Sequence, residues 1–106
     1  MGVTDGAYGH IGSMRTTPGH REQVVALLLS GVDGLRRAGC QLYVVGTADT
    51  DDVTIWVSEV WASAEQHDAA LQLPAAKAAI AQAMPMLTGE FSSRELTVIG
   101  GLGVSG

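Results

Sequence analysis

The sequence has few of the residues that crosslink small proteins or bind nucleic acids. Cys40 is its only cysteine, so no internal disulfide can form and no metal site can be built from cysteines. Lysine and arginine together number 6, against 11 aspartate and glutamate residues, and they are scattered along the chain. A net charge of −5 without a basic stripe argues against nucleic acid and against anionic membranes as partners.

Long apolar runs and phosphate-binding loops are also missing. The longest strongly apolar run covers residues 24–29, far below the ~20 residues of a membrane span. The N-terminus lacks the features of a signal peptide, which predicts a cytoplasmic protein. The glycines of residues 100–106 precede no helix, so they do not indicate a phosphate-binding loop. No histidine or cysteine spacing is typical of a metal site, so we expect no metal.

Apolar residues, in contrast, are abundant for a chain of 106 residues. They make up 46% of the sequence, while charged residues make up 16%. This composition excludes intrinsic disorder and predicts one folded domain, which we place at residues 7–99, with flexible tails at residues 1–6 and 100–106. A small domain has little interior, so we expect a second copy of the chain to cover part of the apolar surface.

Alternating and helical patterns predict the element order β-α-β-β-α-β. Strands are expected at residues 8–15, 40–46, 53–61 and 88–99. A helix is expected to start at Thr17 as its N-cap, with Pro18 at its first position, and to continue over residues 21–38, which carry its apolar stripe. A second helix begins after Ser63 and is broken at Pro74 into two segments that end near residues 72 and 83. This order predicts a ferredoxin-like α+β fold with a four-stranded antiparallel sheet and helices on one face.

The strand over residues 53–61 divides its large side chains between two faces. Ile55, Val57, Glu59 and Trp61 share one face, and Trp56 lies on the other. The sheet face without helices then carries apolar side chains that are unfavourable in water. We therefore expect a homodimer in which two sheets pack face to face.

Four segments between about residues 8 and 99 have the order and spacing that are typical of a known protein family. They are Pro18-Gly19-His20-Arg21, Gly39-Cys40-Gln41-Leu42-Tyr43, Glu59-Val60-Trp61-Ala62-Ser63, and a helix pair containing Asp68, Leu71, Pro74, Lys77 and Ala78. Together these segments resemble the antibiotic biosynthesis monooxygenase domain of the dimeric α+β barrel superfamily. The resemblance implies a dimeric α+β barrel that oxidises a small aromatic polyphenol or quinol with dioxygen and needs no cofactor.

The chain departs from that family's pattern at places that bear on activity. Relatives often have a histidine nine residues after the tryptophan of the Glu-Val-Trp segment and another directly after the proline; here these positions are Ala70 and Ala75. Haem-degrading relatives use an asparagine on the first strand, and this sequence contains no asparagine. These departures argue against haem degradation. They leave open a non-catalytic ligand-binding or accessory protein, or isomerase or cyclase chemistry on a similar barrel.

Histidines are the candidate catalytic groups. We select His67 as the base, because an imidazole can remove a proton from a phenol or quinol near neutral pH. The alternative is an exposed helix histidine beside Asp68. His10 lies in the first expected strand and faces either the ligand cavity or the dimer interface. His20 is expected at the surface.

Four further residues are expected, with His10, to contact an aromatic substrate: Tyr43, Trp61, Met84 and Phe91. A tyrosine can donate a hydrogen bond to a substrate oxygen, and a tryptophan at a strand end can form the wall of a flat pocket. Methionine and phenylalanine near the start of the last strand can adapt to a flat ligand. For each of these residues, packing within the core or over the sheet is the alternative interpretation.

Overall fold

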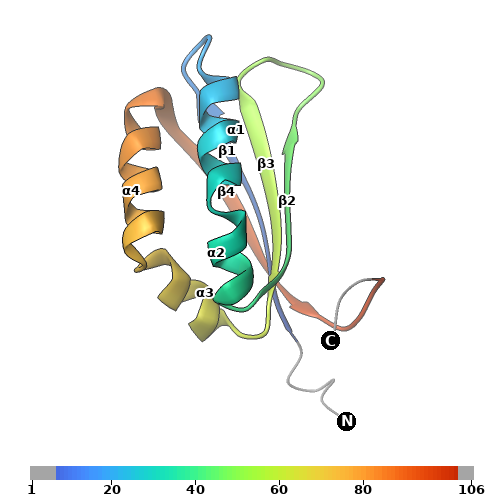
Figure 1. Ribbon diagram of the computed structural model, residues 1–106. Helices are drawn as coiled ribbons and strands as arrows, with labels where there is room; N and C mark the ends of the chain where they lie inside the picture. Colours follow the sequence, from blue (N-terminus) through green and yellow to red (C-terminus); the bar gives the residue numbers. More distant parts are fainter. Residues whose placement is uncertain (1–6, 103–106) are drawn as a thin grey trace.

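The strands and helical regions follow one another along the chain in the expected order β-α-β-β-α-β, with each helical region divided in two. The computed structural model describes residues 7–102. Its elements are β1 (Ala7–Thr16), α1 (Arg21–Ser30), α2 (Val32–Arg37), β2 (Cys40–Thr47), β3 (Thr54–Trp61), α3 (Ala64–Leu71), α4 (Pro74–Ala83), the 3-10 turn η2 (Met84–Met86) and β4 (Leu87–Val98). All strand pairs are antiparallel in the order β2-β3-β1-β4 (Figure 1). The predicted ferredoxin-like α+β fold is therefore confirmed.

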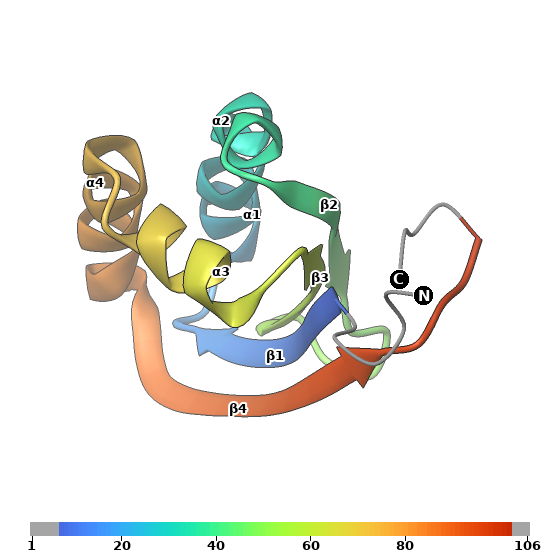
Figure 2. The same cartoon turned by 90° about the horizontal axis from the view of Figure 1, so that it is seen from below.

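The helices form two arms on the same side of the sheet: α1 with α2, and α3 with α4. Figure 2 shows both arms above the curved sheet. The predicted break between the two segments of the second arm is confirmed, because α4 begins at Pro74. Within the described part of the chain, no helix has the length and apolar character needed to cross a membrane. Of the tails expected to be flexible, residues 1–6 and 103–106 lie outside the described residues.

The first arm differs from its prediction at its start and in its middle. The amide of His20 donates to the carbonyl of Thr17 at 3.2 Å, and Gly19 has a φ of +84°, so a tight turn follows β1. A left-handed residue cannot belong to a right-handed helix, so α1 begins only at Arg21 and the predicted N-cap role of Thr17 is wrong. The backbone leaves helical geometry again at Gly31, which divides the predicted single helix into α1 and α2.

The core lies between the helices and the inner face of the sheet. Val24, Ile55, Val57 and Ala83 form a buried cluster there. The two-face prediction for β3 is confirmed, because Ile55 and Trp61 are buried while Trp56 is exposed on the opposite, outer face. The inner face is therefore the one that borders any cavity beneath the helices.

Strand register places four side chains in one row across the helix-bearing face of the sheet, and the last of them, on edge strand β4, is exposed. Tyr43 of β2 pairs with Glu59 of β3, Glu59 pairs with His10 of β1, and His10 pairs with Glu95 of β4. Residues that pair directly on one face of an antiparallel sheet are close neighbours. The register thus brings together polar groups that are far apart in the sequence.

The outer face of the sheet carries apolar side chains in water. Val44, Trp56 and Leu96 lie on three different strands, and each is about half exposed. The helices of residues 7–102 all lie on the other side of the sheet (Figure 2). Exposed apolar groups on several neighbouring strands are typical of a surface that another chain covers.

Candidate active site

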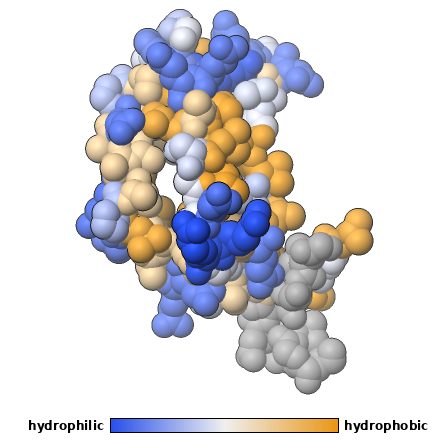
Figure 3. Space-filling model, in the orientation of Figure 1, coloured by the Kyte–Doolittle hydropathy of each residue, from blue (hydrophilic) through white to orange (hydrophobic). Residues whose placement is uncertain are grey.

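A cavity of about 450 Å³ lies between the inner face of the sheet and the two helical arms. The space-filling view shows a hollow between α4 and the α1–α2 arm (Figure 3). Small and apolar residues form most of its walls: Leu27, Leu28, Gly31, Gly34 and Leu35 on one arm, and Ala70, Leu71, Leu73, Ala75, Ala76, Ala79 and Ile80 on the other. Its size is within the range of small-molecule sites. Among residues 7–102, no lysine or arginine lines this cavity.

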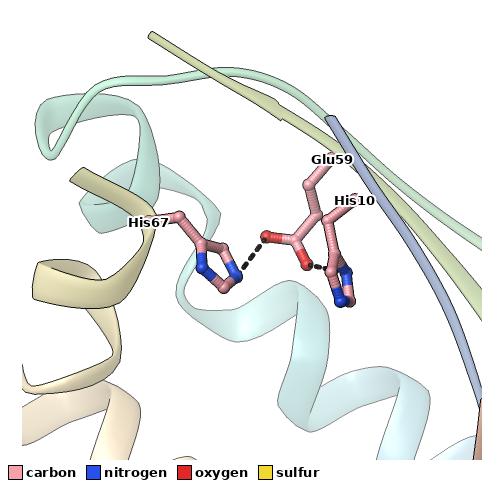
Figure 4. Close-up of side chains that lie close together, drawn as sticks. All are labelled: His10, Glu59 and His67. Atoms are coloured by element: carbon pink, nitrogen blue, oxygen red, sulfur yellow. Dashed lines mark ion pairs between the residues drawn. The ribbon is translucent and has the colours of Figure 1, made fainter. Parts of the chain in front are cut away.

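Three titratable side chains meet at this cavity: His10 from β1, Glu59 from β3 and His67 from α3 (Figure 4). Nδ1 of His10 lies 3.6 Å from Oε2 of Glu59, and Nε2 of His67 lies 3.9 Å from Oε1 of the same carboxylate. Both distances are too long for hydrogen bonds. The three groups therefore surround a shared space, and each of them is mostly buried.

The local sequence explains how His67 reaches this space. Ser63 follows β3 almost directly and caps α3, because its hydroxyl accepts a hydrogen bond from the amide of Gln66 at 3.1 Å. The helix therefore starts at the end of β3, and His67 lies in its first turns, above Trp61. His10 and Glu59 need no loop to meet, since the β1–β3 register places them opposite each other.

Aromatic rings enclose the imidazole of His67. Its centroid lies 5.2 Å from that of Tyr8, 5.5 Å from that of His10 and 5.8 Å from that of Trp61, which it meets edge-on. The His67 side chain is only 12% exposed. It is therefore not the exposed helix histidine of the alternative interpretation.

Asp68 determines which nitrogen of His67 carries the proton. Nδ1 of His67 lies 3.0 Å from Oδ1 of Asp68, and a carboxylate can only accept a hydrogen bond, so Nδ1 is the donor. In the neutral imidazole, Nε2 then has a free lone pair. This nitrogen points toward Glu59 (Figure 4). It is placed to accept a proton or to bind a cation.

Glu59 is the one member of the cluster that the sequence analysis did not select as a site residue. Its Oε1 accepts a hydrogen bond from Nε1 of Trp61 at 2.9 Å, which holds the carboxylate between the two histidines. A signal for it was present, because Glu59 shares its strand face with Ile55, Val57 and Trp61. A carboxylate on an otherwise buried apolar face usually has a partner or a function.

The structure brings most of the selected residues to the cavity. Those that line it are His10, Tyr43, Trp61, His67 and Phe91. Trp61 is only 1% exposed, so its ring packs in the core behind the cavity surface. Its N–H group donates a hydrogen bond to Glu59. The expected contact of Met84 with the cavity is not found: Met84 lies exposed in η2, the 3-10 turn that follows α4, and does not line the cavity.

Tyr43 retains its proton over a wide pH range. Burial raises the pKa of Tyr43 to about 12, and the negative charge of Glu59 adds to this effect. Burial also raises the pKa of Tyr8, together with the charges of Glu95, Asp68 and Glu59. The Tyr43 phenol is therefore a hydrogen-bond donor at neutral pH, next to the carboxylate on the cavity floor.

Comparison with known proteins identifies related chains. Residues 7–82 match the sequence model of a family described as antibiotic biosynthesis monooxygenase. A proposed antibiotic biosynthesis monooxygenase from Chloroflexus aurantiacus J-10-fl is 40% identical, with 93% of this chain and 99% of that chain covered and a TM-score of 0.83. A similarly described protein from Caulobacter crescentus CB15 is 22% identical (90% and 92% covered, TM-score 0.77). Rv0793 from Mycobacterium tuberculosis is 20% identical (91% and 98% covered, TM-score 0.77). At these lower identities the last two show only a shared fold. The search of curated proteins found no match.

Proposed function

The chain belongs to the antibiotic biosynthesis monooxygenase family, and on this premise we propose that it oxidises a small aromatic polyphenol or quinol with dioxygen, without a cofactor. The observation that carries the proposal is the free lone pair on Nε2 of His67 beside an apolar cavity of about 450 Å³. The apolar walls and the shortage of positive charge in the lining favour an uncharged aromatic substrate over an anionic one.

In this proposal His67 starts the reaction as a base. Its Nε2 takes a proton from a phenolic O–H or an activated C–H group of the substrate. The imidazolium that forms lies 3.9 Å from a Glu59 oxygen and 3.0 Å from an Asp68 oxygen, and both negative charges stabilise it. Tyr43 donates a hydrogen bond to the developing substrate oxyanion.

The substrate anion then reduces dioxygen directly. A carbon–oxygen bond forms, and the oxygen–oxygen bond of the resulting peroxide breaks. When the reacting carbon is a CH₂ group, one oxygen atom becomes the carbonyl of the product. The other oxygen leaves as water with both hydrogens, one of them returned by His67. Substrate CH₂ plus O₂ thus gives C=O plus H₂O, and the protein ends unchanged.

Oxygen uptake by the chelator-treated protein tests this proposal against a panel of quinols and anthrone-type compounds. We expect consumption of one O₂ per product molecule and no conversion under anaerobic conditions. Conversion without oxygen would instead indicate isomerase or cyclase chemistry. Tight calorimetric binding without any turnover would favour a ligand-binding or accessory protein. That alternative is supported by Ala70 and Ala75, small apolar residues on the cavity wall.

We also propose that two copies of the chain pack through the outer face of the sheet. The support is the exposure of Val44, Trp56 and Leu96 on that face. A Val44→Asp substitution places two carboxylates in the proposed interface, where an unpaired buried charge costs about 3–5 kcal/mol. We expect the dimer dissociation constant, measured by sedimentation equilibrium, to rise by at least about 100-fold.

The matched control is Leu29→Asp, which adds the same charge at an exposed apolar position on α1. This variant should dimerise like the wild type. Circular dichroism establishes that the Val44→Asp monomer is folded. A wild-type chain that is monomeric at micromolar concentration would contradict the proposal, as would equal dissociation constants for the wild type and Val44→Asp.

A further inference from the structure

We propose that His10, Glu59 and His67 form a binding site for one divalent transition-metal ion, and that this ion, when bound, blocks the base of the proposed oxidation. Their candidate ligand atoms all lie within 4.8 Å of one another, and the residues come from β1, β3 and α3. Two imidazoles and one carboxylate are a donor set suited to zinc and other borderline divalent ions.

The separations within the cluster fit a shared ion better than direct hydrogen bonds. The two nitrogen–oxygen distances are 3.6 and 3.9 Å. Zinc binds nitrogen and oxygen ligands at about 2.1 Å, which places tetrahedral ligand atoms about 3.4 Å apart. The measured distances run to the two different oxygens of the Glu59 carboxylate, and both are within about 0.5 Å of this tetrahedral spacing.

An unpartnered buried atom points to the same conclusion. Nδ1 of His10 is buried and makes no hydrogen bond within the described chain. A buried polar atom without a partner costs free energy, so such atoms in folded proteins usually have a ligand, an ion or a water molecule. A cation between His10 and Glu59 would satisfy this nitrogen.

Two further hydrogen bonds orient the proposed ligands as metal sites require. Asp68 accepts from Nδ1 of His67, which leaves Nε2 free to bind an ion. Trp61 donates to Oε1 of Glu59 and restricts its rotation. Carboxylate–histidine pairs and donors to ligating carboxylates are the usual outer support of protein-bound metals.

The site and the proposed base share one lone pair, that of Nε2 on His67. A bound ion occupies this lone pair, so metal binding and proton abstraction exclude each other. This consequence rests on the proposed function, whereas the metal site itself does not. The cavity borders the cluster, so the remaining coordination positions are accessible to water or to a small ligand.

Calorimetric titration of the chelator-treated full chain with Zn²⁺ tests the site directly. We expect one equivalent per chain and an affinity at least about tenfold lower in His10→Ala and Glu59→Gln than in the wild type. Co²⁺ provides a second readout, because its visible absorption changes when nitrogen and oxygen ligands replace water. The matched control is His20→Ala, which removes a histidine in the turn before α1 that does not line the cavity. It should bind like the wild type.

The absence of saturable Zn²⁺ binding would overturn the site, as would an equal loss of affinity in His20→Ala and His10→Ala. Measurements of oxygen uptake test separately whether the bound ion blocks His67 as the base. Saturating Zn²⁺ should suppress uptake by the wild type, and His10→Ala should require a higher Zn²⁺ concentration for the same fractional suppression. Oxygen uptake that increases with Zn²⁺ would overturn the proposal that metal binding and proton abstraction exclude each other. If no compound is oxidised while Zn²⁺ binds with the expected variant pattern, the proposed function fails and the metal site remains supported.

Discussion

A His67→Ala substitution is expected to lower kcat/KM for quinol oxidation by about 10²–10⁴-fold, the usual contribution of a positioned acid–base group. The effect should be this large because the site holds few substitutes. Nδ1 of His10 is buried and lies 3.6 Å from Glu59, and Tyr43 is a phenol whose pKa of about 12 makes it a donor. The loss should appear mainly in kcat, since the apolar walls that bind the ring remain.

The matched control for this substitution is His20→Ala. His20 is hydrogen-bonded to Thr17 in the turn before α1 and does not line the cavity. Initial rates in an oxygen electrode, with chelator present, compare the three proteins under identical conditions. If wild type and His67→Ala oxidise the same quinol at equal rates, His67 is not the base.

A Trp61→Ala substitution is expected to lower the free energy of unfolding by about 3–5 kcal/mol. Trp61 is the largest fully buried side chain, only 1% exposed, and it packs edge-on against His67. Its loss enlarges the neighbouring cavity and removes the N–H group that binds Glu59. Small domains are stable by about 5–15 kcal/mol, so this one substitution removes a large part of the total.

Urea denaturation followed by circular dichroism measures this effect. Trp61→Phe keeps an aromatic ring and should lose less than Trp61→Ala. Leu29→Ala, a truncation at an exposed position on α1, should change the stability by less than about 1 kcal/mol. Equal denaturation midpoints for Trp61→Ala and Leu29→Ala would contradict the structural role assigned to Trp61.

The element order and the strand faces were predictable because they depend on local patterns. Alternation over residues 53–61 separated Trp56 from Trp61 correctly, and Pro74 marked the break in the second arm. The errors occurred where the backbone dihedral angles of single glycines determine where a helix begins or ends. The left-handed φ of Gly19 moved the start of α1 past the predicted cap, and Gly31 divided a helix whose apolar spacing continues through it.

The candidate site was only partly predictable for a different reason. Alternation shows which face a side chain occupies, but it does not show which residue of another strand lies opposite. The row that joins Tyr43, Glu59, His10 and Glu95 follows from register across four strands, which one sequence does not reveal. Likewise, the enclosure of His67 depends on where α3 crosses the end of β3, so its surroundings became clear only in three dimensions.

The small residues of the cavity walls set the size of the ligand that fits, and they are different residues from those that would react with it. Gly31 and Gly34 face the cavity from one arm, and Ala75, Ala76 and Ala79 face it from the other, whereas the titratable groups come from β1, β3 and α3. A larger side chain at a wall position would shorten the space for a ligand without touching His10, Glu59 or His67. The same backbone and the same reactive cluster could therefore be adapted to molecules of different lengths by single substitutions in the walls.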